Sequence, residues 1–191
     1  MNFSTGSGGN IIAHGDLNLS SDMTGVNAAM GITIGGGGAA SMAGIANTGA
    51  LVNFNKQGFG IWTVNGEITP NGGNIRQQGG ILEFSSTAST AGNAIITAGN
   101  RSNGGIMRFA QGSDVKSASG NTNDILGGWA TYDNTTWAKT NGSGNAIDGL
   151  TTFVDDVWAA GNNTNVTLGG SDPAPPRRRT ACASTSAVRN P

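Results

Sequence analysis

Side chains that could carry acid, base or nucleophilic chemistry are few in this chain of 191 residues. His14 is the only histidine, so a Ser-His-Asp triad or a histidine-based metal site would have to be built around it. It lies in the segment IIAHGDL near the start of the sequence, where a solvated histidine is the simpler interpretation. The sequence therefore gives no positive sign of nucleophilic catalysis.

Paired carboxyl groups are the other chemistry to consider, because two acids that flank one sugar bond can hydrolyse it. Asp155 and Asp156 are adjacent, and adjacent residues of a strand point to opposite faces, so they make a poor catalytic pair. Glu67 and Glu83 lie on separate expected strands and could align if those strands stack. We predict no catalytic residue among these acids.

Common ligand-binding loops are also missing from the sequence. The nonapeptide of calcium-binding β-rolls does not occur, and neither does an EF-hand loop. The four glycines at 35–38 lack the Lys and Ser/Thr of a phosphate-binding loop and indicate a turn. We predict no metal and no cofactor.

Large aromatic side chains gather in the final third of the chain, within a region otherwise rich in Gly, Asn and Thr. Their wide apolar rings suit a cap over the end of a stacked core. The alternative is a platform of exposed rings that contacts glycans. Packing is favoured for this set, whose members are Trp129, Tyr132, Trp137, Phe153 and Trp158.

The elements that must position these residues are short strands. Thirty-three glycines and only 11% charged residues argue against a helical bundle, and 36% apolar residues with a net charge of −1 argue against disorder. Apolar and polar residues alternate, as in strands with one buried face, between turn clusters of Gly and Asn. We expect strands at 16–20, 31–35, 50–54, 60–68, 80–84, 93–98 and 105–109.

Recurring phrases distinguish two all-β architectures. GGNI, GGIL and GGIM each bring two glycines before apolar residues, and this degenerate repetition favours a parallel β-helix of stacked coils. A β-sandwich is the alternative, because frequent turns also fit it. Asn residues in equivalent turns could hydrogen-bond to each other, or present polar groups to glycans and neighbouring cells. Uncapped coil ends would expose strand edges and favour self-association.

The composition changes abruptly at residue 171. We assign residues 1–170 to the β-helix repeat domain, with aromatic-rich coils at its C-terminal end, and residues 171–191 to a Pro/Arg-rich disordered tail that holds the only cysteine. Residues 1–170 carry six Lys/Arg against ten Asp/Glu, so nucleic-acid binding is not expected. The sequence shows neither an export signal nor a transmembrane segment, and we interpret the chain as a fragment.

The segment ILGGWATYDNTTWAKTNGSGNAIDGLTTFVDDVWAAGNNTNVTL, residues 125–168, resembles bacterial autotransporter-associated β-strand repeat proteins. In that family a Gly-Gly-Trp-Ala-Thr phrase is followed by Asn/Asp-x-x-Trp-Ala and, further on, by a second Trp-Ala phrase. The phrases GGNI, GGILEF and GGIMRF resemble the looser repeats before it. The resemblance implies a right-handed parallel β-helix, displayed on or secreted from a bacterial cell within a longer passenger polypeptide, with no shared catalytic motif.

We therefore expect a non-catalytic structural or adhesive module of a bacterial surface or secreted protein. Its expected partners are glycans or the surface of a host or neighbouring cell. The alternative is a β-helical polysaccharide lyase or glycoside hydrolase. A lyase needs a basic residue and often a calcium ion, and the sequence shows no acidic cluster for the calcium. The basic residues available are Lys56, Arg76, Arg101 and Arg108.

Overall fold

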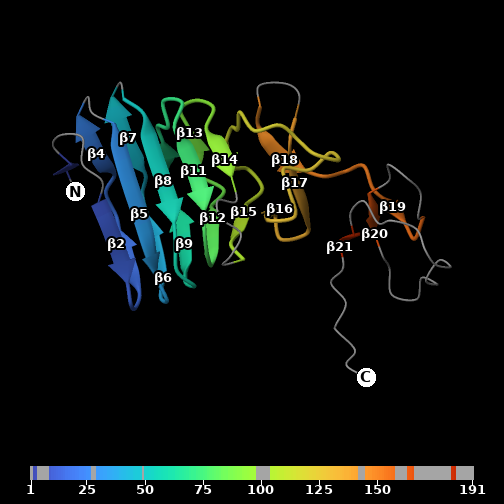
Figure 1. Cartoon of the computed structure of the whole chain (residues 1–191), viewed down its shortest axis with the longest axis horizontal. Coiled ribbons are helices and arrows are strands. Elements are labelled where there is room, and N and C mark those ends of the chain that lie inside the picture. Colours follow the sequence, from blue (N-terminus) through green and yellow to red (C-terminus); the bar gives the residue numbers. More distant parts are fainter. Residues whose placement is uncertain are drawn as a thin grey trace.

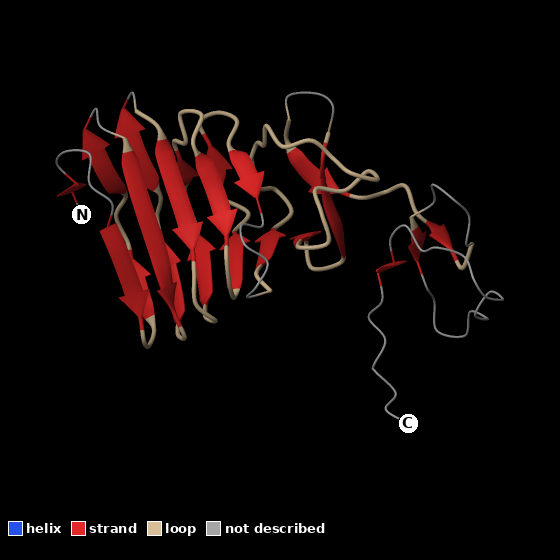
Figure 2. Cartoon of the chain, viewed as in Figure 1, coloured by secondary structure: helices blue, strands red, loops and turns tan. Residues whose placement is uncertain are grey.

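The computed structural model describes residues 2–3, 9–26, 29–48, 50–97, 104–141, 145–157, 163–165 and 182–183. Throughout these ranges the chain forms strands and turns (Figure 2). None of the described segments is a helix that could span a membrane.

Three sheets of parallel strands lie along the molecule, and each coil of the chain adds one strand to each sheet in turn (Figure 1). Sheet A contains β1 (Asn2–Phe3), β4 (Met23–Val26), β7 (Ile45–Thr48), β10 (Glu67–Ile68) and β13 (Ser89–Thr90). Sheet B contains β2 (Gly9–Ala13), β5 (Met30–Gly36), β8 (Val52–Lys56), β11 (Asn74–Gln77) and β14 (Ile95–Thr97). Sheet C begins with β3 (Leu17–Leu19), β6 (Ala39–Met42), β9 (Ile61–Val64), β12 (Ile81–Phe84) and β15 (Ile106–Phe109).

This arrangement is a right-handed parallel β-helix, which confirms the expected fold class (Figure 1). Residues in register between neighbouring coils are 20 to 25 positions apart, as in the Ile61–Ile81 and Ile81–Ile106 pairs. Side-chain hydrogen bonds such as those of the Gln57–Gln78 and Asn18–Ser41 pairs also join neighbouring coils. The strands that successive coils contribute to each sheet pair in parallel. A β-sandwich needs two antiparallel sheets, so that alternative does not apply.

Inward-facing residues stack in rows along the axis. The rings of Phe84 and Phe109 lie parallel, with their centroids 5.1 Å apart. Trp62 stands in register between Ala40 and Leu82, so a small neighbour on one side makes room for the large ring. Its indole Nε1 donates a hydrogen bond of 3.1 Å to the carbonyl of Gly35, which satisfies the only polar atom of the buried side chain.

Glycine is required where sheet B turns into sheet C, because the backbones of neighbouring coils touch there. A Cβ atom on Gly60 would lie 2.1 Å from the carbonyl oxygen of Gly38. At Gly58 the backbone has φ +71°, and a Cβ atom would lie 2.6 Å from the carbonyl oxygen of Gly36. The recurring glycine phrases of the sequence therefore mark the corners of successive coils.

The expected strand at 60–68 is wrong at its centre. The chain forms β9 and β10 instead, separated by Asn65 and Gly66. A Cβ atom on Gly66 would lie 2.3 Å from the carbonyl oxygen of Ala43 in the preceding coil, so the chain bends at this second corner. The alternation of apolar and polar residues continues across the bend, because both strands place apolar residues inward, and the sequence therefore looked like one strand.

Antiparallel strands follow the last complete coil and extend sheet C. Strand β16 (Ala130–Tyr132) pairs in parallel with β15, and β17 (Thr136–Thr140) and β18 (Ile147–Gly149) continue the sheet in antiparallel order. Residues 125–150 are called the terminal cap below. A separate small sheet contains β19 (Val154–Asp155), β20 (Thr164–Asn165) and β21 (Cys182–Ala183). The remainder of the expected tail lies outside the described residues.

Candidate functional site

Three of the five predicted aromatic residues lie within the terminal cap, whereas Phe153 follows the cap and is exposed. Trp129 and Tyr132 are half-buried and pack against the core, and Tyr132 pairs in register with Phe109. Trp137 is a half-buried residue of β17. Trp158 lies outside the described residues. Contacts with a glycan stay a prediction for these rings.

Residues considered for catalysis are not brought together. His14 is exposed in the turn between β2 and β3. Glu67 belongs to β10 of sheet A and Glu83 to β12 of sheet C, so these two acids face outward from different sheets. Asp155 ends β19, and Asp156 follows it with φ 53°. In the described part of the chain, no group of three His, Cys, Asp or Glu side chains could hold a metal ion.

Arg108, one of the candidate lyase bases, is engaged by a neighbour on sheet C. Its guanidinium lies 3.8 Å from the carboxylate of Glu83 in the preceding coil, and both side chains are about one-third exposed. A guanidinium stays protonated in proteins, so it does not accept a proton readily. This pair therefore resembles a surface ion pair more than a poised base.

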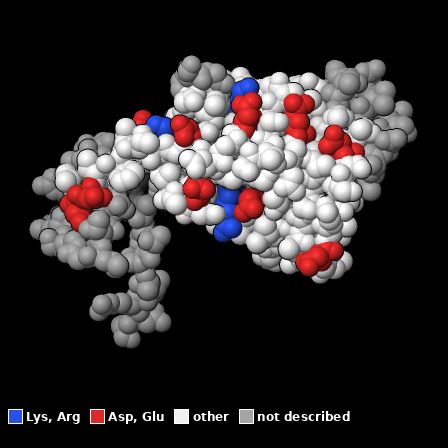
Figure 3. Space-filling model, turned by 180° about the vertical axis from the view of Figure 1, so that it is seen from behind, with Lys and Arg blue, Asp and Glu red and all other residues white. Residues whose placement is uncertain are grey.

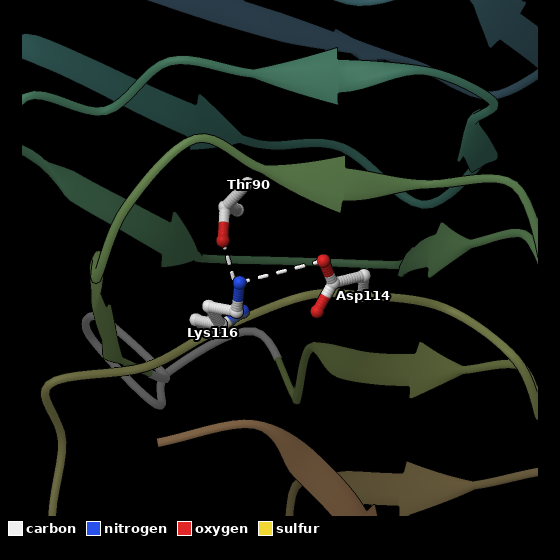
Figure 4. A network of polar contacts seen from close by, with 3 residues as sticks. All are labelled: Thr90, Asp114 and Lys116. Atoms are coloured by element: carbon white, nitrogen blue, oxygen red, sulfur yellow. Dashed lines mark hydrogen bonds and ion pairs between the residues drawn. The ribbon is translucent and has the colours of Figure 1, made fainter. Parts of the chain in front are cut away.

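A polar cluster at the end of sheet A has a structural role. Figure 4 shows Lys116 between Thr90 and Asp114, with its ammonium 3.4 Å from the Asp114 carboxylate. The backbone N–H of Lys116 donates a hydrogen bond of 2.9 Å to Thr90 Oγ1. Thr90 is buried, so its hydroxyl satisfies a backbone group of the irregular segment that covers β13.

Two buried polar side chains occupy the same inward row of sheet B, and the sequence did not predict their burial. Lys56 is fully buried, and its Nζ donates to the carbonyl oxygens of Gln57 (2.6 Å), Gly58 (3.2 Å) and Gly79 (3.0 Å). Burial lowers the pKa of Lys56 from 10.5 to about 8. Gln77 pairs in register with Lys56, and its Nε2 donates to the next corner at Gly79 and Gly80, each at 2.8 Å. Both side chains therefore hold the backbone of the corners in place through hydrogen bonds made inside the core.

The outward side of sheet B carries rows of amides and hydroxyls, which we call the amide face. Two of its rows are linked between coils: Asn53 Oδ1 accepts a hydrogen bond of 3.1 Å from Asn74 Nδ2, and Gln57 Nε2 donates one of 2.8 Å to Gln78. The row between them has no side-chain hydrogen bond within the described residues. The members of this central row are Asn10, Thr33, Asn55, Arg76 and Thr97.

The amide face also differs from its surroundings in charge. Seen from behind, the Lys and Arg groups that show lie beside acidic atoms, and the acids are scattered (Figure 3). Arg76, by contrast, is exposed and makes no ion pair with any described residue. None of the described outward positions of sheet B is Asp or Glu. Apart from Arg76, the described outward positions of this face are uncharged, and they include the exposed apolar side chains of Ile12 and Ile95 as well as the amides and hydroxyls.

No protein family model matches this chain, and no curated protein or solved structure is significantly similar to it.

Proposed function

We propose that the chain is a non-catalytic structural and adhesive module of a bacterial surface or secreted protein of the autotransporter type. The observation that carries this proposal is the amide face, whose central row makes no side-chain hydrogen bond to described residues. The stacked apolar core beneath it provides a stiff support. Polar groups that the fold does not use are available for contacts with glycans or a neighbouring cell.

Display on a cell tests this function. The chain would be placed between an export signal and an outer-membrane translocator in a Gram-negative host, with the same carrier lacking the chain as control. We expect a protease-resistant chain on the cell surface and stronger attachment of those cells to glycan-coated surfaces. Full surface display of the folded chain without any gain in attachment would contradict the adhesive role.

The enzymatic alternative is tested on the purified protein. Acidic and neutral polysaccharides would be incubated with it, and new reducing ends and unsaturated products would be measured. We expect neither product. Activity that is lost in Arg108→Ala, while the circular dichroism spectrum stays unchanged, would overturn the non-catalytic assignment in favour of a lyase.

End-to-end association is a further part of the proposed function. Ile11, Leu17 and Leu19 in the first coil are only half-buried although they pack against the core, and β2 and β3 lie at the ends of their sheets. Apolar atoms and unpaired strand edges favour contact with another coil. We expect the sedimentation coefficient to rise with protein concentration. A strictly monomeric species over the whole range would contradict this expectation.

A further inference from the structure

We infer that the amide face binds an extended acidic polysaccharide built from uronate sugars, with the polymer lying along the axis of the coil. This inference rests on the proposed adhesive function and names the ligand class of that surface. It starts from a difference among the rows of sheet B. Each outer row contains one amide pair that joins two coils, whereas the central row of Asn10, Thr33, Asn55, Arg76 and Thr97 contains no such pair.

The repeat of the coils favours an extended polymer. Register places Thr33 beside Asn55 and Asn55 beside Arg76, one coil apart at each step. Neighbouring strands are about 4.8 Å apart, so a hydroxyl, an amide and a guanidinium follow one another along a straight line. A polysaccharide offers hydroxyl groups at regular intervals, each of which can donate and accept a hydrogen bond. One straight chain can therefore contact several coils together.

The positive charge of Arg76 favours acidic polysaccharides over neutral ones. Among the other described cations, Arg108 and Lys116 are paired with Glu83 and Asp114 and Lys56 is buried. Lys139 belongs to β17 of the terminal cap, away from sheet B, and stands opposite Asp148 in register. Arg76 is exposed on a face whose described outward positions carry no carboxylate. Its planar guanidinium can bind a carboxylate through two parallel hydrogen bonds. One cation is too few for a nucleic acid, which needs a cluster of them.

Binding of alginate, a polyuronate, is the direct test, with its propylene glycol ester as a ligand of the same backbone but reduced charge. Affinity would be measured by calorimetry in calcium-free buffer with the whole chain. We expect tighter binding of alginate than of the ester. Arg76→Gln should weaken alginate binding about tenfold, as expected for the loss of one charge-assisted contact, and should leave binding of the ester unchanged.

Two further variants show whether the effect belongs to this face. Arg108→Gln removes the same charge from sheet C, so alginate binding should stay as in the wild type. Asn55→Ala removes a neutral group of the central row and should weaken both ligands to a similar extent. Each variant would be compared with the wild type by circular dichroism and thermal melting, since all three side chains lie on the outer surface.

The remaining outcomes separate this inference from the function on which it rests. Equal binding of alginate and ester, unaffected by Arg76→Gln, would overturn the acidic ligand and leave a glycan-binding surface. Binding to anionic lipid vesicles without binding to alginate would overturn the polysaccharide. No binding to any of these ligands would overturn the inference alone, because attachment of displaying cells is measured independently.

Discussion

Inward and outward rows of the same strands differ in the polarity and the burial of their side chains. In sheet B, Ile32, Phe54 and Ile75 form an inward row that is fully buried, while Asn55 and Arg76 project outward from the intervening positions. The backbone is common to both sides, so only the surroundings of each side chain differ. Stability is therefore concentrated in the inward rows and the corners. Outward residues can change without loss of the fold, which makes them the natural place for recognition.

The sharpest test of this comparison is to truncate one residue from each side of β12. Phe84→Ala removes a buried ring from the Phe84–Phe109 stack and should lower the free energy of unfolding by about 3–5 kcal/mol. Glu83→Ala, its outward neighbour, loses a partly exposed ion pair and should cost about 1 kcal/mol or less. Urea unfolding measures both. Similar losses in the two variants would show that the two sides are not distinct.

Lys56 is a charged residue in an inward position where most residues are apolar. Its burial predicts that the stability of the fold depends on pH. Its pKa is about 8 in the folded protein against an ordinary 10.5, so between these values the unfolded chain binds the proton more tightly. The free energy of unfolding should therefore rise as the pH increases from about 8 to 10.5 and should lack this contribution below pH 8.

Lys56→Gln is the matched variant for this prediction, because Gln77 already occupies the equivalent position of the next coil. The variant should fold and should lose the rise in stability over that pH range. Thermal melting at several pH values measures the effect. A rise that persists unchanged in the variant would assign the pH dependence to another group.

Smaller effects are expected on the amide face. Asn53→Ala removes the acceptor of two hydrogen bonds from Asn74 and should lower the free energy of unfolding by about 1 kcal/mol. Asn55→Ala, in the central row, should change it by only about 0.5 kcal/mol or less. If Asn55 proved as important to stability as Asn53, the central row would have a structural role.

The smallest effect is expected at Phe59, which is 84% exposed at the corner before β9. Phe59→Ser should leave the free energy of unfolding within about 0.5 kcal/mol of the wild type, although it removes a large apolar ring. Urea unfolding again measures the change. A loss comparable to that of Phe84→Ala would mean that the ring makes a stabilising contact in solution.

Strands of sheet C were the easiest to predict from sequence. The expected strands at 80–84 and 105–109 each begin only one residue before β12 and β15, because a glycine corner and an alternating apolar pattern mark both. Sheet A was missed in four coils, where the strands β1, β4, β7 and β13 are short, with few large apolar residues. The strands β2, β6 and β11 of the other two sheets were missed as well. Their partners lie one coil away in sequence, beyond the reach of any local pattern.

Polar residues were harder to place than strands. Asn contacts were expected between turns, whereas Asn53 and Asn74 make theirs from the outward side of strands. Lys56 and Gln77 look like surface residues by type alone. Each of them, however, stands two positions before a glycine of the corner, and this repeat is the signal that could have identified them.

Hydrogen bonds between coils point along the axis, and this direction determines how the rod responds to mechanical load. Tension applied at the ends acts on the bonds of one coil at a time, so coils should detach singly from an end. A coil of 20 to 25 residues adds about 4.8 Å to the folded rod but about 70–80 Å once pulled straight. The tension on a cell tethered through such a rod would therefore fall in steps, because each coil would unwind before the next one came under load.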